Sequence, residues 1–288
     1  MPLDGHPPYS PGMTQLDIES LGIIAGRGVY PLLLAEAARR RGARRIVAAA
    51  FRGETDRSIN KLADDVHWLH VGQLQELLDT LAAARVRRAV MAGQITPTNL
   101  FRVRPDARCI ALLKRLPVKN AETIFGAVAE ELRSVGIELL PASSFMEDYM
   151  PAAGVLSCRP PSESEWKDIE HGLMVARATS ALDIGQTVAV KQGVVLAVEA
   201  FEGTDEAIAR AARLGGPGIV VVKVAKRGHD MRFDIPVVGM HTVKVLRKAR
   251  AAAMAVEAGR CIILEREAVM EAINRCGIAM AAVEAESG

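Results

Sequence analysis

Aromatic residues are scarce in this sequence of 288 residues: Phe, Trp and Tyr make up only 4% of it, although half of the chain is hydrophobic. The core must therefore be built from Ala, Val, Leu and Ile, which usually fill α/β layers. Long apolar runs are also missing. The longest runs, at 194–198 and 219–222, have the length of a strand, far below the roughly 18–20 residues that span a bilayer.

An excess of one charge is absent as well. The 36 Lys and Arg nearly balance the 34 Asp and Glu, which gives a net charge of +2 and argues against a general nucleic-acid binder. The proline-rich start has neither a basic stretch nor an apolar stretch, so it does not resemble a signal peptide. We expect a cytoplasmic protein in which residues 1–18 form a disordered extension.

The few cysteines form no recognisable metal or redox motif. No C-x-x-C pair occurs, no histidine stands at zinc-finger spacing, and disulfides are not expected in the cytoplasm. Cys261 and Cys276 have apolar neighbours, which predicts thiols in the core.

The hydrophobic pattern divides the chain into two parts. Residues 19–142 alternate strand-length apolar runs with helical patterns, which is typical of βαβ units and a parallel sheet. Residues 143–162 are rich in proline and predict a linker. Residues 163–288 combine four predicted helices (164–181, 204–214, 242–253 and 265–276) with a hairpin and further strands. We predict an α/β fold: an N-terminal Rossmann-like domain with a parallel sheet, and a C-terminal mixed α/β domain.

Two turns of the first part are candidates for substrate binding. Gly26, Gly28 and Val29 link the first strand to the first helix, where backbone N–H groups can face a phosphate. Gln94 and Ile95 follow the fourth strand, and ligands bind beyond the carboxyl ends of parallel strands. The glycines could equally serve a tight turn alone, and Gln94 could be an ordinary loop amide.

The first turn departs from the dinucleotide-binding fingerprint. Pro31 occupies the position of its third glycine, and the second strand ends in Phe51-Arg52 where an acidic residue would bind ribose. The pattern therefore favours a phosphate or nucleotide loop over an NAD loop.

The densest group of polar residues follows the apolar run 219–222. Lys226, Asp230, Arg232 and Asp234 lie close together in it. Lys and Arg bind phosphate oxygens, and carboxylates hold Mg²⁺, which in turn binds phosphates. The alternative is a solvated charged loop. The strand before the group, together with Gly228 and Pro236, favours a functional site.

A third candidate site lies around 182–205. Glu199 alternates with apolar residues along a predicted strand, and such a carboxylate needs a partner. Thr204 can cap the next helix, which is the default interpretation, or offer its hydroxyl to a phosphate. Gln186 lies at the start of the neighbouring strand.

These motifs occur together, in this order, in one known family. The matching segments are 21–31, 71–72, 91–94, 182–186, 196–205, the series Lys226…Asp230-x-Arg232-x-Asp234-x-Pro236-x-x-Gly239, and 258–269. Over roughly residues 20–284 the chain resembles the UDP-2,3-diacylglucosamine pyrophosphatases of the LpxI type, which act in lipid A biosynthesis. It departs from the family at Arg227-Gly228-His229, where Pro-x-Gln is usual.

The resemblance implies a two-domain hydrolase that holds its lipid substrate between the domains. It implies Mg²⁺-dependent cleavage of UDP-2,3-diacylglucosamine to UMP and 2,3-diacylglucosamine 1-phosphate (lipid X), with attack at the β-phosphate. The family's essential aspartate falls on Asp234, as metal ligand or water-orienting base. A homodimer is also implied, and a lipid substrate is compatible with transient contact with the inner membrane surface.

The remaining roles follow from charge. Asp230 would be a second metal ligand, and Lys226 and Arg232 would neutralise the phosphates. Two other classes compete with this hypothesis. Arg52, which is suited to a 2′-phosphate, motivates a nucleotide- or NADP-binding module without hydrolase activity, and a lipid carrier would bind the product without hydrolysis.

Overall fold

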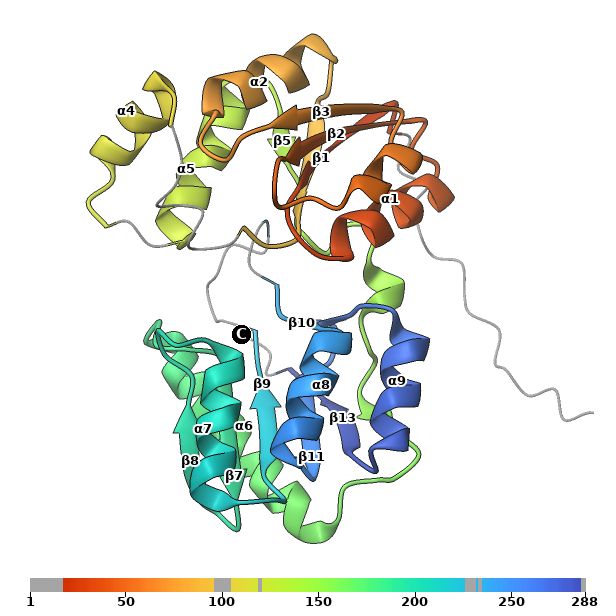
Figure 1. Cartoon of the computed structure of the whole chain (residues 1–288), viewed down its shortest axis with the longest axis vertical. Helices are drawn as coiled ribbons and strands as arrows, with labels where there is room; N and C mark the ends of the chain where they lie inside the picture. Colours follow the sequence, from red (N-terminus) through yellow and green to blue (C-terminus); the bar gives the residue numbers. More distant parts are fainter. Residues whose placement is uncertain (1–17, 96–104, 119–120, 226–231, 233–234, 286–288) are drawn as a thin grey trace, which may run out of the picture.

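The fold consists of two α/β domains, one above the other in the view of Figure 1. The computed structural model describes residues 18–95, 105–118, 121–225, 232 and 235–285. The predicted disordered extension lies outside this part of the chain, except for Ile18, which is buried. The small strand β10 (Val237–Val238) lies where the two domains meet.

The N-terminal domain contains a five-stranded parallel sheet with the order β3-β2-β1-β4-β5. The strands are β1 (Ser20–Ala25), β2 (Arg45–Phe51), β3 (Asp65–Leu69), β4 (Arg88–Ala92) and β5 (Glu138–Leu139). Ala25 at the end of β1 lies opposite Ala92 at the end of β4. The predicted parallel Rossmann-like sheet is thus confirmed, and the loops that follow β1 and β4 leave from one edge.

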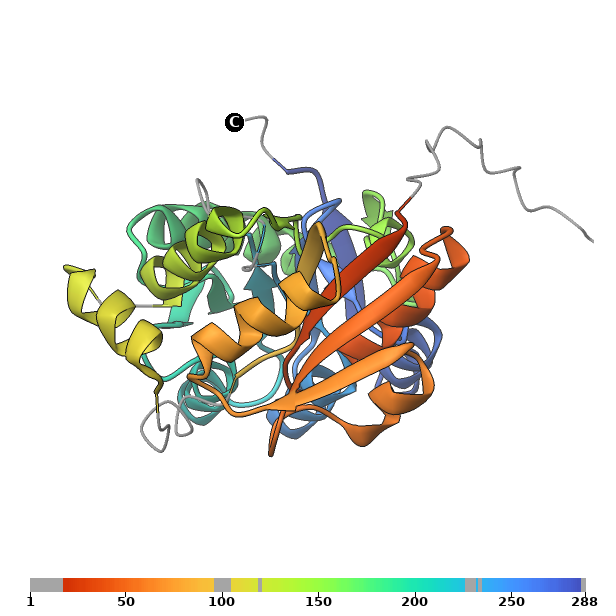
Figure 2. The same ribbon diagram turned by 90° about the horizontal axis from the view of Figure 1, so that it is seen from above.

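Helices cover both faces of this sheet. Ile23 packs in one core cluster with Leu34 of α1 (Tyr30–Arg40), whereas Ile24 packs in the other with Leu78 of α2 (Leu74–Ala83). This alternation is the two-residue period of a strand. The other described helices of this domain are η1 (Arg57–Lys61), α4 (Ala107–Arg115) and α5 (Ala121–Ser134), of which α4 lies at the rim of the domain (Figure 2).

The predicted linker 143–162 joins the two sheets, but much of it is packed. Phe145 and Met146 are buried in the N-terminal core, just before the short helix η2 (Glu147–Tyr149). Strand β6 (Gly154–Val155) then pairs antiparallel with β13 (Ala279–Val283) of the C-terminal sheet. The first part of the segment therefore belongs to the N-terminal domain, and strand β6 belongs to the C-terminal domain.

The C-terminal domain contains a mixed six-stranded sheet with the order β6-β13-β11-β9-β7-β8, as predicted for a mixed α/β domain. Its longer strands are β7 (Thr187–Lys191), β8 (Val194–Val198), β9 (Val220–Lys223), β11 (Ala253–Glu257) and β13. Helix α6 (Glu163–Ala181) packs on one face. The other face is covered by α7 (Thr204–Gly215), α8 (Met240–Ala249) and α9 (Arg266–Arg275).

The central strand β11 corrects the predicted helix 242–253. Helix α8 ends at Ala249, and Arg250 adopts the left-handed conformation with φ of 50°. Ala253 already pairs with Val220 of β9 and Ala279 of β13. Alanine favours helices, but tertiary pairing in a buried sheet outweighs that preference here. The small strand pair β10 and β12 (Ile262–Ile263) was likewise not predicted as a pair.

In the described part of the chain, no helix combines the length and the apolar character needed to cross a membrane.

Candidate functional site

The two predicted loops of the N-terminal domain meet at the carboxyl edge of its sheet. Gly26 N donates to Ala92 O at 2.8 Å, and Arg27 N donates to Gln94 O at 2.6 Å. Gln94 N returns a bond of 3.2 Å to Arg27 O, so that Arg27 and Gln94 form an antiparallel bridge. Ile95 packs against the core beneath the second loop.

Glycine is required in this bridge for two different reasons. A Cβ atom on Gly26 would lie 2.6 Å from Gln94 O, and one on Gly93 would lie 2.6 Å from Arg27 O. Gly28 has open space around it but a φ of +97°, which disfavours side chains. Val29 then occupies the N-cap of α1. The glycines serve the turn, and their contact with a ligand stays a prediction.

Replacing Gly93 by alanine is expected to destabilise the protein more than replacing Gly28. Both residues have positive φ, +87° and +97°, and the strain alone should cost about 1–2 kcal/mol of the free energy of unfolding. Only Gly93→Ala adds a collision with the backbone of Arg27. Thermal and urea unfolding of the two variants measure the difference, and equal losses would mean that the bridge tolerates a side chain.

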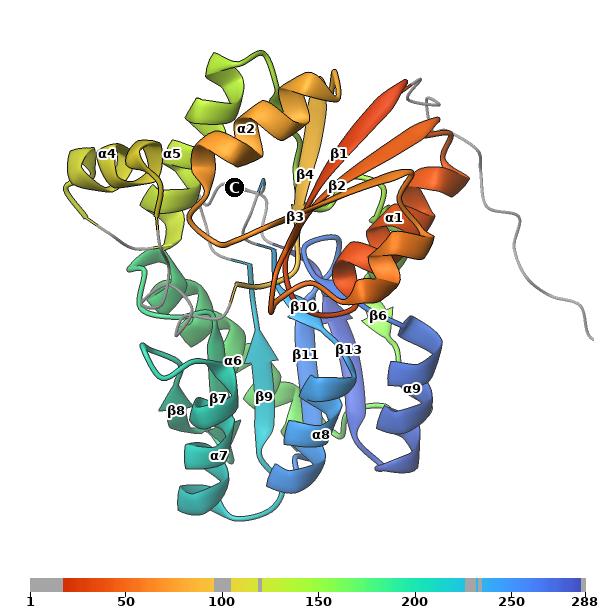
Figure 3. The ribbon, with the colours of Figure 1, turned by 45° about the horizontal axis from the view of Figure 1, so that its top comes forward.

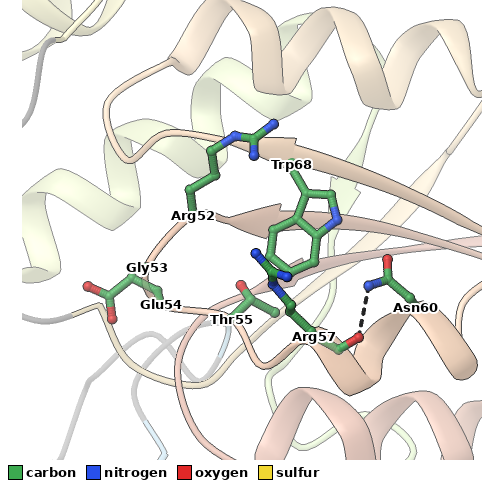
Figure 4. A pocket seen from close by; sticks show the side chains of 7 residues that line it. All are labelled: Arg52, Gly53, Glu54, Thr55, Arg57, Asn60 and Trp68. Carbon is green, nitrogen blue, oxygen red and sulfur yellow. Dashed lines mark hydrogen bonds between the residues drawn. The ribbon is translucent and has the colours of Figure 1, made fainter.

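An open cavity of about 560 Å³ lies beyond the ends of β2 and β3 (Figure 4). Its lining residues are Arg52, Gly53, Glu54, Thr55, Arg57, Asn60 and Trp68. Trp68 packs on the core and also lines this cavity. The Thr55 hydroxyl accepts from Phe51 N at 2.8 Å and donates to Ala25 O, which ties the cavity's loop to the end of β1.

Most of the predicted catalytic residues lie outside the described part of the chain. Lys226, Asp230 and Asp234 fall outside the described residues, and Arg232 is half-buried. The segment begins after β9, which points toward the N-terminal domain (Figure 3).

Both flanks of this segment are firmly held. On one side, Ala225 N donates to Glu257 Oε2 at 3.0 Å, and Glu257 Oε1 accepts from Arg177 Nε of α6 at 3.0 Å. On the other side, Ile235 is 9% exposed and belongs to the N-terminal core cluster that includes Tyr30. The described chain therefore enters this segment at the carboxyl edge of the C-terminal sheet and resumes at Ile235 in the core of the N-terminal domain.

The third predicted site lies at the same edge of the C-terminal sheet. Thr204 Oγ1 donates to Glu199 Oε1 at 2.8 Å and accepts from Lys223 Nζ at 2.9 Å. The expected capping role of Thr204 is wrong, because Gly203 is the N-cap of α7 and the hydroxyl is used by Glu199 and Lys223. Gln186 O accepts from Val224 N at 2.9 Å, two residues before segment 226–234.

Sequence reasoning did not single out Lys223, Glu257 or Thr187 as site residues. Lys223 and Glu257 are 7% and 3% exposed, and each closes an otherwise apolar strand. A charged residue at the end of an all-apolar run was the available signal, because such a residue must find a partner or a ligand at the sheet edge.

The cysteines divide into two kinds. Cys261 is buried, as predicted, and this burial raises the pKa of its thiol to about 12, so that it stays protonated at neutral pH. Cys276 is exposed after the end of α9, which overturns its predicted place in the core. The apolar residues beside it in sequence pack inward, whereas Cys276 itself forms the C-cap.

Known proteins resemble this chain over almost its whole length. The sequence profile of the LpxI N-terminal domain matches residues 20–149, and that of the LpxI C-terminal domain matches residues 152–281. The UDP-2,3-diacylglucosamine pyrophosphatase LpxI of Caulobacter vibrioides is 31% identical over 284 residues, which cover 93% of this chain and 98% of the relative. Two matching domains in the same order, and one relative aligned from end to end, place the chain in the LpxI family.

Proposed function

We propose that this protein hydrolyses the pyrophosphate bond of UDP-2,3-diacylglucosamine and releases UMP and 2,3-diacylglucosamine 1-phosphate, a step of lipid A biosynthesis. Its family and the name of the Caulobacter relative support the reaction. The structural observation that supports it is the anchoring of the two residues that flank segment 226–234, the proposed catalytic segment: Ala225 is held at one sheet edge, and Ile235 is buried in the core of the other domain.

The chain's own charges suit an anionic pyrophosphate. Lys226 and Arg232 would offset the negative charge of the phosphates, which must fall before water can attack. Asp234 would orient or deprotonate the attacking water. Glu257 acts through the backbone, because its bond to Ala225 N fixes the point at which the segment leaves β9.

A magnesium ion fits the donor set of this segment. Asp230 and Asp234 would provide carboxylate oxygens, the ligands that Mg²⁺ prefers. Among the described residues, no three His, Cys, Asp or Glu side chains gather to hold a metal. When bound, the ion would act as a Lewis acid on the phosphoryl oxygens.

The substrate's form extends the proposal. The two acyl chains need apolar surface, and we place them between the domains, where ligand sites are common. Gly26, Gly28, Val29, Gln94, Ile95, Gln186 and Thr204 stay candidates for substrate contact. A homodimer and transient contact with the inner membrane surface belong to the same proposal.

Hydrolysis in ¹⁸O-labelled water tests the reaction and shows which phosphorus atom the water attacks. Purified protein with UDP-2,3-diacylglucosamine is expected to release UMP and the lipid 1-phosphate in equal amounts. Attack at the β-phosphate would place the label in the lipid product, which mass spectrometry detects. A label in UMP would move the attack to the α-phosphate, and no UMP at all would refute the proposed function.

A further inference from the structure

A row of polar side chains crosses three strands at the carboxyl edge of the C-terminal sheet. Thr187 of β7 lies opposite Lys223 of β9, and Glu199 N donates to Thr187 O at 2.8 Å just beyond β8. All three project from the face that α7 covers. The residues two positions away on the same strands belong to the apolar core of that face: Ala189, Val221 and Ala197. On this face of the sheet, the side chains therefore change from apolar to polar at this row.

The hydrogen bonds in this row have a fixed direction. The Thr204 hydroxyl has one proton, which it donates to Glu199 Oε1, and its lone pair accepts from Lys223 Nζ. The ammonium group also lies 3.5 Å from Thr187 Oγ1. The chain of bonds runs from Lys223 through Thr204 and ends at the carboxylate of Glu199.

The other oxygen of that carboxylate has no donor. Glu199 Oε2 is buried and finds no hydrogen-bond partner in the described part of the structure. A buried acceptor that has lost its water is costly to leave unpaired, and more so when it is charged. Thr204 and Lys223 hold Glu199 in place, so that the free oxygen cannot easily turn to another partner.

We propose that Glu199 Oε2 accepts a hydrogen bond from a sugar hydroxyl of the substrate, with Thr204 and Lys223 as positioning residues. This inference rests on the proposed function, whose substrate carries a ribose and a glucosamine. Carboxylates commonly bind sugar hydroxyls at the carboxyl edge of α/β sheets. A metal ion is a poorer occupant, because the Lys223 ammonium group lies only two hydrogen bonds away. Uracil is poorer too, because carbonyl oxygens flank its imide N–H.

The occupant also has to be near the phosphates, and the order of the residues along the chain agrees with this. Lys223 precedes Lys226 by three residues, on the strand that leads into the catalytic segment. A nucleotide or sugar phosphate bound by that segment would bring its hydroxyls toward the row.

Binding of product fragments tests the assignment. Isothermal titration compares UMP, 2′-deoxy-UMP, 3′-deoxy-UMP and the lipid 1-phosphate on wild type and Glu199→Gln, with Glu206→Gln, an exposed residue on α7, as the matched control. We expect Glu199→Gln to weaken one hydroxyl-bearing product roughly 10- to 100-fold. If the ribose is the source, UMP loses this affinity and the deoxy analogue that lacks the bound hydroxyl does not; if glucosamine is, only the lipid 1-phosphate loses it.

The positioning role has its own readout. Thr204→Val should weaken the same product and no other, and Thr204→Ser, which keeps the hydroxyl, should restore the affinity. Equal weakening of UMP and both deoxy analogues would assign Glu199 to another donor and overturn the inference. So would unchanged affinities in a Glu199→Gln protein that still folds by circular dichroism. If the wild type binds no product and releases no UMP, the proposed function itself fails, and this inference with it.

Discussion

The Asp234→Ala variant is expected to release UMP from UDP-2,3-diacylglucosamine at least about a thousandfold more slowly than wild type, while it still binds the substrate. Loss of one group that stabilises charge in a transition state commonly costs a hundred- to a thousandfold in rate. Asp234 would also hold the metal, so its loss should reach the upper end. Asp234→Asn, which keeps the shape and removes the charge, should behave in the same way.

Substrate retention separates a chemical role from a structural one. Mass spectrometry of the purified Asp234→Ala protein should find the intact UDP-linked lipid bound to it. The neighbouring Ile235 packs in the N-terminal core, so thermal unfolding must be measured in parallel. A folded variant with a rate of UMP release near that of wild type would remove Asp234 from the catalytic site.

Removal of divalent metal is expected to abolish hydrolysis. The pyrophosphate of the proposed substrate is dianionic, and we expect Lys226 and Arg232 to neutralise only part of the charge that would develop on the phosphoryl oxygens. Exhaustive treatment with EDTA followed by desalting should therefore leave no UMP release, and added Mg²⁺ should restore it.

Two controls give this experiment its meaning. Thermal unfolding of the EDTA-treated and untreated proteins should be measured in parallel, so that loss of activity is separated from loss of the fold. Metal titration of Asp230→Ala should require more Mg²⁺ than wild type if Asp230 is a ligand. Full activity after removal of the metal would rule out the magnesium hypothesis.

The fold was largely predictable from the sequence, and the strand that the prediction missed depends on contacts that are distant in the sequence. Alternation of short apolar runs with helical patterns indicated the parallel sheet of the N-terminal domain, because both periods are local properties. Strand β11 was missed: the predicted helix 242–253 ran into its first residue, Ala253, and no element was predicted for the rest of the strand, in which alanine and methionine predominate. Its conformation depends on pairing with β9 and β13, and no local pattern encodes that pairing.

The site was predictable where a chain segment acts through its backbone. The loops after β1 and β4 were expected at one sheet edge, and the structure brings them into direct contact. The hydroxyl of Thr204 was harder to predict. An N-terminal threonine usually caps its helix, but here Gly203 takes the cap, and distant Lys223 and Glu199 compete successfully for the hydroxyl.

The bridge between Arg27 and Gln94 changes what the Rossmann-like sheet can hold. In the order β3-β2-β1-β4-β5, the winding reverses between β1 and β4, and doubly wound sheets hold nucleotides in the crevice at this topological switch point. Here the backbone itself occupies that crevice with two hydrogen bonds. A dinucleotide such as NADP would have to break them to take its usual place. We therefore expect a ligand of this domain to bind outside the bridge and to leave its two hydrogen bonds intact.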